Sequence, residues 1–151
     1  MQRPHIIPPV KVPANDNGYF EEMTRAVFQA GIDWEVIRQR WPAFRIAFKR
    51  FSVAGVAGFG PEDVDRLMRL DSGIVRNYRK ILATVHNAVA MLELRKEFGS
   101  FASYIRSFDG HGYVPLVKDL KKRFHYLGNT GSFVFLHRVG EPVPEWEARR
   151  I

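Results

Sequence analysis

The stretch EDVDRLMRLDSGIVRNYRKILATVHNA, residues 62–88, has the pattern of two helices joined by a short turn. Pro61 and the two acidic residues after it are typical of a helix start, because proline fits the first turn and negative charge favours the positive helix end. Gly73 supplies the turn, and apolar residues at helical spacing follow from about Asn77. The stretch therefore predicts a helix-hairpin-helix.

The second of these helices starts with a cluster of positive charge. Unpaired amides at a helix N-terminus bind phosphate, a glycine beside them allows close approach, and basic side chains add mobile charge. We therefore predict that a phosphate backbone binds at Gly73, Ile74, Arg76, Asn77, Arg79 and Lys80. The alternative is an ordinary helical hairpin whose basic side chains are only solvated.

Composition favours a polyanionic partner. The chain has 151 residues, 46% of them hydrophobic, which suits one core and leaves little room for a second domain. Its formal net charge of +7 makes nucleic acid the first partner to expect. The absence of cysteine excludes disulfides and thiolate metal sites, and the five histidines have no metal-ligand spacing. We expect no metal, no cofactor and no membrane segment, and a monomer in the cytoplasm associated with the nucleoid.

Apolar residues at spacings of three and four recur along the rest of the chain and predict an all-α fold of about seven to nine short helices. We place a compact multi-helix domain at 19–139, after a proline-rich extended arm at 1–18 and before a loosely packed tail at 140–151. Pro42 predicts a break between two short helices, because proline lacks an amide hydrogen and clashes with the preceding turn. The apolar run at 133–136 leaves a strand open as an alternative to a helix.

Three pieces of the sequence are more specific than these patterns. They are QAG at 29–31 together with Trp34, GIVRNYRKI at 73–81, and GNT at 128–130. With their flanking segments they resemble, in the same order, the DNA-3-methyladenine glycosylase I family of the helix-hairpin-helix DNA glycosylase superfamily. The resemblance spans residues 19–139, and the chain is identified as a divergent member of that family.

The resemblance implies an all-helical enzyme that bends duplex DNA, extrudes an alkylated adenine and hydrolyses its N-glycosidic bond. Trp34 stands at the family's stacking tryptophan, and a methylated adenine carrying positive charge stacks favourably on an electron-rich ring. Gln29 and Thr130 are the other candidate base-binding residues, and Gly31 and Ile32 lie at the family's duplex-probing loop. The alternative roles are structural: core packing for the tryptophan and isoleucine, and helix capping for the threonine.

The sequence departs from the family at its best-known acidic group. Ala26 stands where the family has the glutamate that contacts the damaged base. Glu22, one turn earlier on the same helix face, and Asp33, next to Trp34, are the candidate replacement acids. Their structural alternatives are a solvated first-turn acid and a helix N-cap. The family's cysteine-containing zinc site is also missing, which agrees with the expectation of no metal.

Two functions from different classes remain open from the sequence. The leading one is a monofunctional repair glycosylase for 3-methyladenine in duplex DNA. The alternative is a catalytically weak or inactive module that recognises DNA lesions on the same fold, and a helical adaptor between proteins is a weaker third. Only the enzyme requires an open pocket beside Trp34 with a carboxylate or a water within reach.

Overall fold

The computed structural model describes residues 9–151, which form eight α-helices and three short 3-10 helices, with no strand in that range. The α-helices are α1 (Asp16–Gln29), α2 (Trp34–Ala47), α3 (Val53–Ala57), α4 (Pro61–Leu67), α5 (Tyr78–Phe98), α6 (Phe101–Arg106), α7 (Tyr113–Arg123) and α8 (Asn129–Arg138). The predicted all-α class is confirmed, and residues 133–136 belong to helix α8. Among the described residues, no helix is both long and apolar enough to span a membrane.

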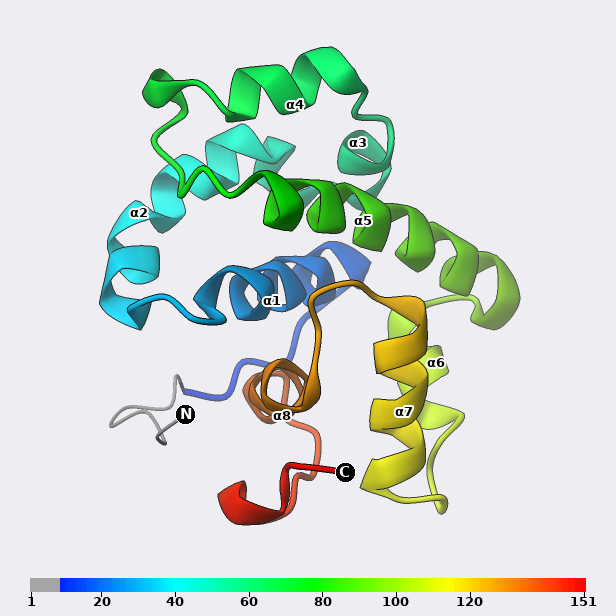
Figure 1. Ribbon diagram of the computed structural model, residues 1–151. Coiled ribbons are helices and arrows are strands. Elements are labelled where there is room, and N and C mark those ends of the chain that lie inside the picture. The colour runs from blue at the N-terminus through cyan, green and yellow to red at the C-terminus, as the bar shows by residue number, and fades with distance from the viewer. Residues whose placement is uncertain (1–8) are drawn as a thin grey trace.

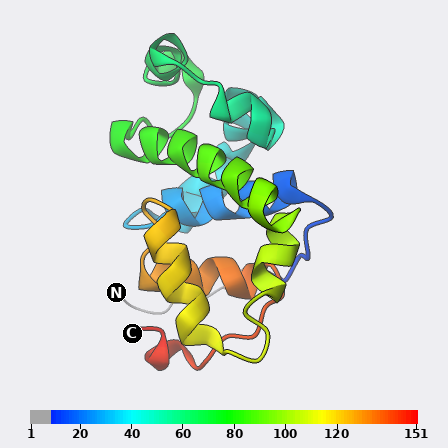
Figure 2. The ribbon, with the colours of Figure 1, turned by 90° about the vertical axis from the view of Figure 1, so that its right-hand side faces the viewer.

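Helix α1 lies at the centre of the molecule. Helices α2 to α5 pack on one side of it and α6 to α8 on the other, and the long helix α5 crosses over α1 and leads into α6 (Figures 1 and 2). Much of the core is aromatic: its fully buried rings include Phe20, Phe28, Phe44, Phe48, Phe51, Phe101, Tyr104 and Phe135. Burial of these rings on both sides fixes α1 as the central element, which contacts α2, α3, α5, α6 and α8.

Side-chain caps start several helices where the sequence predicts them. The Asn77 side chain accepts a hydrogen bond from the Lys80 amide at 3.1 Å, so α5 begins directly after it. Asp33 accepts from the Glu35 amide at 2.9 Å and starts α2 in the same way. Helix α1 begins at Asp16, earlier than the expected domain start at 19, because Asn15 caps it.

The predicted break at Pro42 is wrong. Helix α2 continues through this proline as one element. A proline inside a helix costs about 3 kcal/mol. However, Ile37, Trp41 and Phe44 are buried on both sides of it, and each contributes about 1.5–3 kcal/mol on burial. Packing of this face outweighs the lost backbone hydrogen bond.

The expectation of a loosely packed C-terminal tail is also wrong. Trp146 is only 5% exposed and packs edge-on against Phe133 of α8, with ring centroids 5.3 Å apart. Arg149 is buried too, and its guanidinium lies 4.0 Å from the centre of the Trp146 ring. The tail therefore covers one face of α8. Burial of a large aromatic side chain lowers the free energy by more than the conformational entropy that the short segment loses.

The described part of the predicted N-terminal arm is extended and lies along the end of α8. The Lys11 amide donates to the Arg138 carbonyl at 2.7 Å, which ties the arm to that end. Gly140 has a φ of +90°, and a β-carbon there would lie 2.9 Å from the Val12 side chain, so glycine permits this close contact. Residues 1–8 of the arm lie outside the described part of the chain.

Candidate active site

A pocket of about 360 Å³ opens beside Trp34, at the junction of α1, α2, α8 and the arm. Its lining residues are Pro9, Arg25, Gln29, Trp34, Glu35, Arg38 and Arg138. A smaller cavity of about 40 Å³ adjoins it and is lined by Ala26, Gln29, Ala30, Trp34, Thr130, Gly131 and Val134. The two cavities share Gln29 and Trp34. Four positions that the sequence analysis singled out, 26, 29, 34 and 130, therefore line one continuous site.

Trp34 is half-buried and is held from behind. It packs against a small cluster formed by Phe133, Val134 and Trp146, which joins α8 to the C-terminal tail. One part of the indole is thus fixed by apolar contacts while another part borders the pocket. Such a ring offers a rigid stacking surface, since its orientation does not have to be restricted when a planar ligand binds.

Gln29 lines both cavities, and its side-chain oxygen is buried without a hydrogen-bond partner among the described residues. Its side chain is only 7% exposed, and its Oε1 atom has no hydrogen-bond partner within the described part of the chain. A buried carbonyl oxygen without a donor costs about 1–3 kcal/mol, so such atoms usually mark a ligand or a water site. An amino group on a bound planar ligand would satisfy Gln29.

Neither candidate replacement acid is free to serve the pocket. Glu22 is buried and accepts hydrogen bonds from Arg25 Nε at 3.3 Å and from Arg138 Nε at 2.9 Å. It lies behind these two arginines and is not among the residues that line the pocket. Asp33 is exposed and occupied as the N-cap of α2. Both carboxylates therefore occupy structural roles, and the N-cap is the one that the sequence offered as the alternative for Asp33.

The acid that does line the pocket, Glu35, was missed in the sequence. Its carboxylate accepts a hydrogen bond from Arg38 Nε at 2.9 Å, and this bond holds the pKa of Glu35 below its usual value. Glu35 and Arg38 are both largely exposed at the pocket mouth. Their spacing of three residues on one helix predicts the pair, but nothing in that spacing places it beside Trp34.

Two pocket-lining arginines, Arg25 and Arg138, were also missed. Burial lowers the pKa of Arg25, whose guanidinium also lies 4.3 Å from the centre of the Trp41 ring. Arg138 comes from the end of α8 and reaches Glu22 of α1 across 116 positions of sequence. No local pattern reveals such a contact. The two arginines thus give this wall of the pocket two positive charges, and Glu22, which does not line the pocket, pairs with both of them.

The turn between α4 and α5 is held by close packing. Gly73 has a φ of +79°, and a β-carbon there would lie 3.0 Å from the Ala43 side chain of α2. Its carbonyl accepts a hydrogen bond from Arg40 Nη1 at 3.3 Å. Ile74 is buried, so only its backbone borders the surface, whereas Arg76 and Arg79 are exposed. Glycine at position 73 thus serves both the turn and the contact with α2.

Lys80 does not fit the prediction of a mobile surface charge. Its side chain is 4% exposed, and its ammonium group donates to the Phe28 carbonyl at 3.2 Å and to the Ala30 carbonyl. Burial lowers the pKa of Lys80. The reason is the inward direction of this position on α5, because the side chain points at the end of α1 rather than away from the protein.

The loop between α1 and α2 carries the two predicted duplex-probing residues. Gly31 is exposed with a φ of +75°, and no atom lies within 4 Å of where its β-carbon would be. Ile32 is half-buried and packs against the core. On the other side of the site, the Thr130 hydroxyl accepts a hydrogen bond from Arg149 Nε at 3.1 Å, and Thr130 lines the small cavity together with Trp34.

Comparison with known proteins shows the family of this chain. The family model for methyladenine glycosylase matches residues 10–122. The chain belongs to this family. It is 31% identical to DNA-3-methyladenine glycosylase 1 of Escherichia coli, over 85% of this chain and 79% of that protein. It is 30% identical to DNA-3-methyladenine glycosylase of Haemophilus influenzae, over 80% of this chain and 75% of that protein.

Solved structures give the same result. 3-Methyladenine DNA glycosylase I from Staphylococcus aureus superposes with a TM-score of 0.76 at 26% identity, covering 86% of this chain and 79% of that one. The solution structure of a 3-methyladenine DNA glycosylase I superposes with a TM-score of 0.72 at 31% identity, covering 85% of this chain and 79% of that one. This protein therefore shares the fold of the solved structures on which it superposes.

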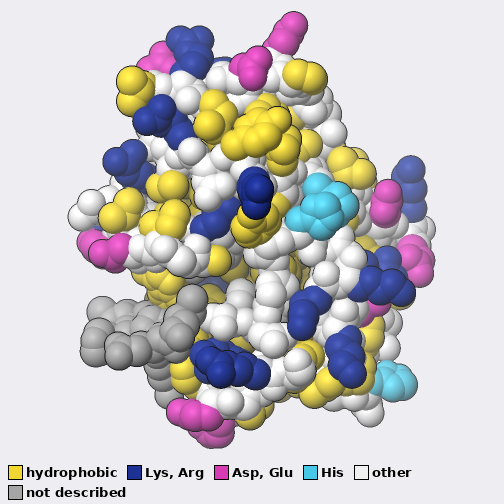
Figure 3. Space-filling model, in the orientation of Figure 1, with side chains coloured by type: hydrophobic (Ala, Val, Ile, Leu, Met, Phe, Trp, Pro, Cys, Tyr) yellow, Lys and Arg dark blue, Asp and Glu magenta, His cyan; other side chains and the backbone are white. Residues whose placement is uncertain are grey.

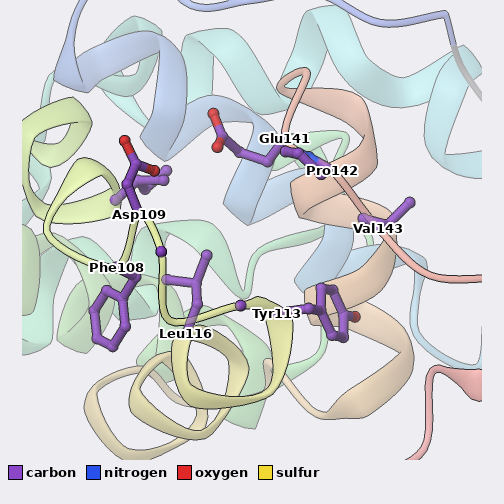
Figure 4. A pocket seen from close by; sticks show the side chains of 10 residues that line it. Phe108, Asp109, Tyr113, Leu116, Glu141, Pro142 and Val143 are labelled. Atoms are coloured by element: carbon purple, nitrogen blue, oxygen red, sulfur yellow. The ribbon is translucent and has the colours of Figure 1, made fainter.

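The protein has another cavity, of about 260 Å³, away from Trp34 (Figure 4). It lies between α6, the start of α7 and residues 141–143, and Asp109 and Glu141 point toward its upper side. Arg106 pairs with both of these carboxylates, at 3.5 Å from Asp109. None of the predicted site residues lines this cavity, so the active-site assignment rests on the Trp34 pocket.

Positive charge on the protein is spread over a broad surface. In Figure 3, lysine and arginine side chains occur both around the helices above α1 and around α7 below it, with apolar side chains between them. A broad basic face suits a long polyanion better than a single small anion. Among residues 9–151, no group of three or more possible metal ligands occurs.

Proposed function

We propose that this protein is a monofunctional DNA glycosylase that hydrolyses the N-glycosidic bond of 3-methyladenine flipped out of duplex DNA. The observation that carries the proposal is the open pocket beside the half-buried Trp34, with Gln29 among its lining residues. The family match and the relatives named for this activity support the same conclusion. The protein acts as a monomer and needs no cofactor in this proposal.

The reaction uses the charge that the damaged base already carries. The flipped base stacks on Trp34, and its amino group donates to Gln29 Oε1. The bond between the sugar C1′ and the base breaks, and its electron pair neutralises the positive base. Water then adds to C1′ of the oxocarbenium-like sugar and gives up a proton, so the products are free 3-methyladenine and an abasic site. No lysine nucleophile takes part, and the DNA strand is not cleaved.

DNA is held by groups around the pocket. We assign phosphate contacts to the exposed Arg76 and Arg79 and to the backbone at Gly73 and Asn77, where α5 begins. Ile32 at the tip of the α1–α2 loop fills the space that the flipped base leaves, and Gly31 lets this loop approach the duplex. Ile74 contributes backbone only, since its side chain is buried.

The base is recognised here without an unpaired carboxylate. Glu22 is neutralised by Arg25 and Arg138, and Glu35 is paired with Arg38. We therefore assign base recognition to stacking on Trp34 and to the neutral Gln29 oxygen. A charged hydrogen bond is roughly twice as strong as a neutral one, so this enzyme should excise 3-methyladenine more slowly than one with a carboxylate at position 26.

The test is release of free 3-methyladenine from methylated duplex DNA under single-turnover conditions. We expect release by the wild type, a loss of at least about tenfold in Trp34→Ala, and partial retention in Trp34→Phe, because phenylalanine keeps an aromatic face. Asp33→Asn tests the other candidate acid: asparagine keeps the N-cap of α2 without the charge and should change the rate little. Binding to the DNA without any release by the wild type would overturn the proposal and favour the non-catalytic lesion-binding module.

A further inference from the structure

We propose that Lys80 is a positioning residue, which links the DNA-facing start of α5 to the loop that carries Ile32 and Trp34. This inference rests on the proposed function, because the loop acts only when a base is flipped. It assigns Lys80 a role other than phosphate binding, although the residue belongs to the basic cluster at the start of α5.

The geometry joins two elements through one side chain. The Lys80 backbone lies in the first turn of α5, where its amide donates to the Asn77 cap at 3.1 Å. Its ammonium group donates to the carbonyls of Phe28, at 3.2 Å, and of Ala30. Helix α1 ends at Gln29, so the Phe28 carbonyl belongs to its last turn and the Ala30 carbonyl to the residue that follows it, and neither has an amide partner further along the helix. Lys80 therefore caps α1 from the start of α5.

A buried ammonium group needs compensation, and a carboxylate does not supply it here. No ion pair of Lys80 with an acid occurs in the described part of the chain, and burial lowers its pKa. The negative end of the α1 dipole supplies part of the compensation. The same charge is unfavourable at the N-terminal end of its own helix α5. An apolar residue of equal length would avoid both costs, so the distinctive contribution of the lysine is to fix two carbonyls of α1.

Fixing Ala30 also restricts the loop that comes after it. Only residues 31–33 separate Ala30 from Trp34, and the Ile32 amide donates back to the Gln29 carbonyl at 3.2 Å. A shift of the end of α1 relative to α5 therefore moves Ile32 and Trp34 relative to the phosphate contacts. Since a misplacement of about 1 Å can lower a rate about a hundredfold, this link sets how accurately the flipped base meets its pocket.

The experiment compares Lys80→Met, which keeps the length and removes the donors, with Thr84→Val as a matched control. Thr84 is also fully buried on α5, but its hydroxyl bonds only to the Lys80 carbonyl within the same helix. Three quantities are measured on folded protein: the salt dependence of binding to undamaged duplex, the single-turnover release of 3-methyladenine, and the fluorescence of 2-aminopurine placed next to the lesion, which reports unstacking.

We expect Lys80→Met to keep the wild-type salt slope, to lose about 10- to 100-fold in release, and to unstack the reporter less. Thr84→Val should keep all three properties. A salt slope lowered by about one would overturn the proposal and make Lys80 a phosphate ligand. Wild-type release and wild-type unstacking in Lys80→Met would overturn it as well.

Two further measurements cover a variant that does not fold and a wild type that releases no base. If Lys80→Met does not fold, Lys80→Gln, which keeps one donor group without the charge, replaces it and should show a smaller loss of the same kind. If the wild type releases no base, the proposed function has failed separately, and the reporter then decides the inference. Reduced unstacking in the variant supports a positioning role, and unchanged unstacking rejects it.

Discussion

At the scale of single residues, position 26 is where the family resemblance predicts a glutamate and this chain has alanine. Ala26 borders the small cavity beside Trp34. The nearest acid on the same helix face, Glu22, is already bonded to two arginines. The site therefore combines an aromatic surface with a buried amide oxygen that has no partner in the described part of the chain. The acid among its described lining residues is Glu35, and Glu35 is paired with Arg38.

Restoring the acid should increase activity. We expect Ala26→Glu to raise the single-turnover rate of 3-methyladenine release by about tenfold, because a carboxylate that pairs with a cationic base contributes on the order of 1–2 kcal/mol more than a neutral group. Ala26→Gln is the control, since it has the same shape without the charge and should show a much smaller increase. Equal rates for the two variants would mean that charge at position 26 has no part in recognition.

At the scale of elements, the basic residues around the turn between α4 and α5 lie in different environments. Arg76 and Arg79 are exposed, whereas Lys80 is buried against the end of α1. Arg40 of α2 holds the turn through the Gly73 carbonyl. A cluster that looks uniform in the sequence is thus divided by the direction in which each side chain leaves the helix.

The exposed arginines should account for part of the salt dependence of DNA binding. Arg76→Gln and Arg79→Gln should each lower the slope of log binding constant against log salt concentration by about one, because each phosphate contact releases about one counterion. Lys96→Gln, at the far exposed end of the same helix, is the control and should leave the slope unchanged. Slopes equal to the wild type in both arginine variants would move the phosphate contacts to another surface.

A pair of histidines links α5 to the segment after α7. The rings of His86 and His125 stack with centroids 3.5 Å apart, and His86 Nε2 lies 3.2 Å from the Arg123 carbonyl. Burial, and secondarily the nearby His86, lower the pKa of His125 below its usual value of 6.5. The unfolded chain therefore binds a proton at higher pH than the folded chain does, and stability falls as the pH drops through 6.5.

The predicted decrease of stability at low pH can be measured by thermal unfolding. We expect the Tm of the wild type to fall between about pH 7.5 and about pH 5.5, and to fall less in His125→Gln, which cannot take up the proton. His111→Gln is the control, because His111 is exposed in the loop between α6 and α7. A decrease in His125→Gln as large as in the wild type would assign the pH dependence to other groups.

At the scale of the whole molecule, the two ends of the chain complete the active site. Trp146 in the tail packs in the cluster that holds Trp34, and Pro9 of the arm lines the same pocket. Arg138, between them, joins α8 to Glu22 of α1. The site thus depends on segments that are separated by nearly the full length of the chain.

Removing the tail contact should affect both stability and activity. Trp146→Ala should lower the free energy of unfolding by about 3–5 kcal/mol, since it removes a buried indole, and should also weaken binding of free 3-methyladenine measured by Trp34 fluorescence. Trp146→Phe keeps most of the packing and should lose much less of either. A Trp146→Ala protein with wild-type stability would show that the tail is as loosely held as its composition suggests.

Local chemistry explains what the sequence determined by itself. The all-α class, the caps at Asp33 and Asn77, the turn at Gly73 and the family all depend on neighbouring residues or on short motifs, whose hydrogen bonds and φ angles are set within a few positions. The tertiary structure alone decided that α2 continues through Pro42, because buried aromatic packing outweighs one lost backbone bond.

The same reason applies to the charged groups of the site. The tertiary structure alone decided that Lys80 turns inward, that Glu22 is neutralised by Arg25 and Arg138, and that Trp146 supports Trp34. A charged or aromatic side chain takes its role from the atoms that surround it after folding, since desolvation and partners set its energy. Those atoms come from distant parts of the chain, and no local spacing specifies them.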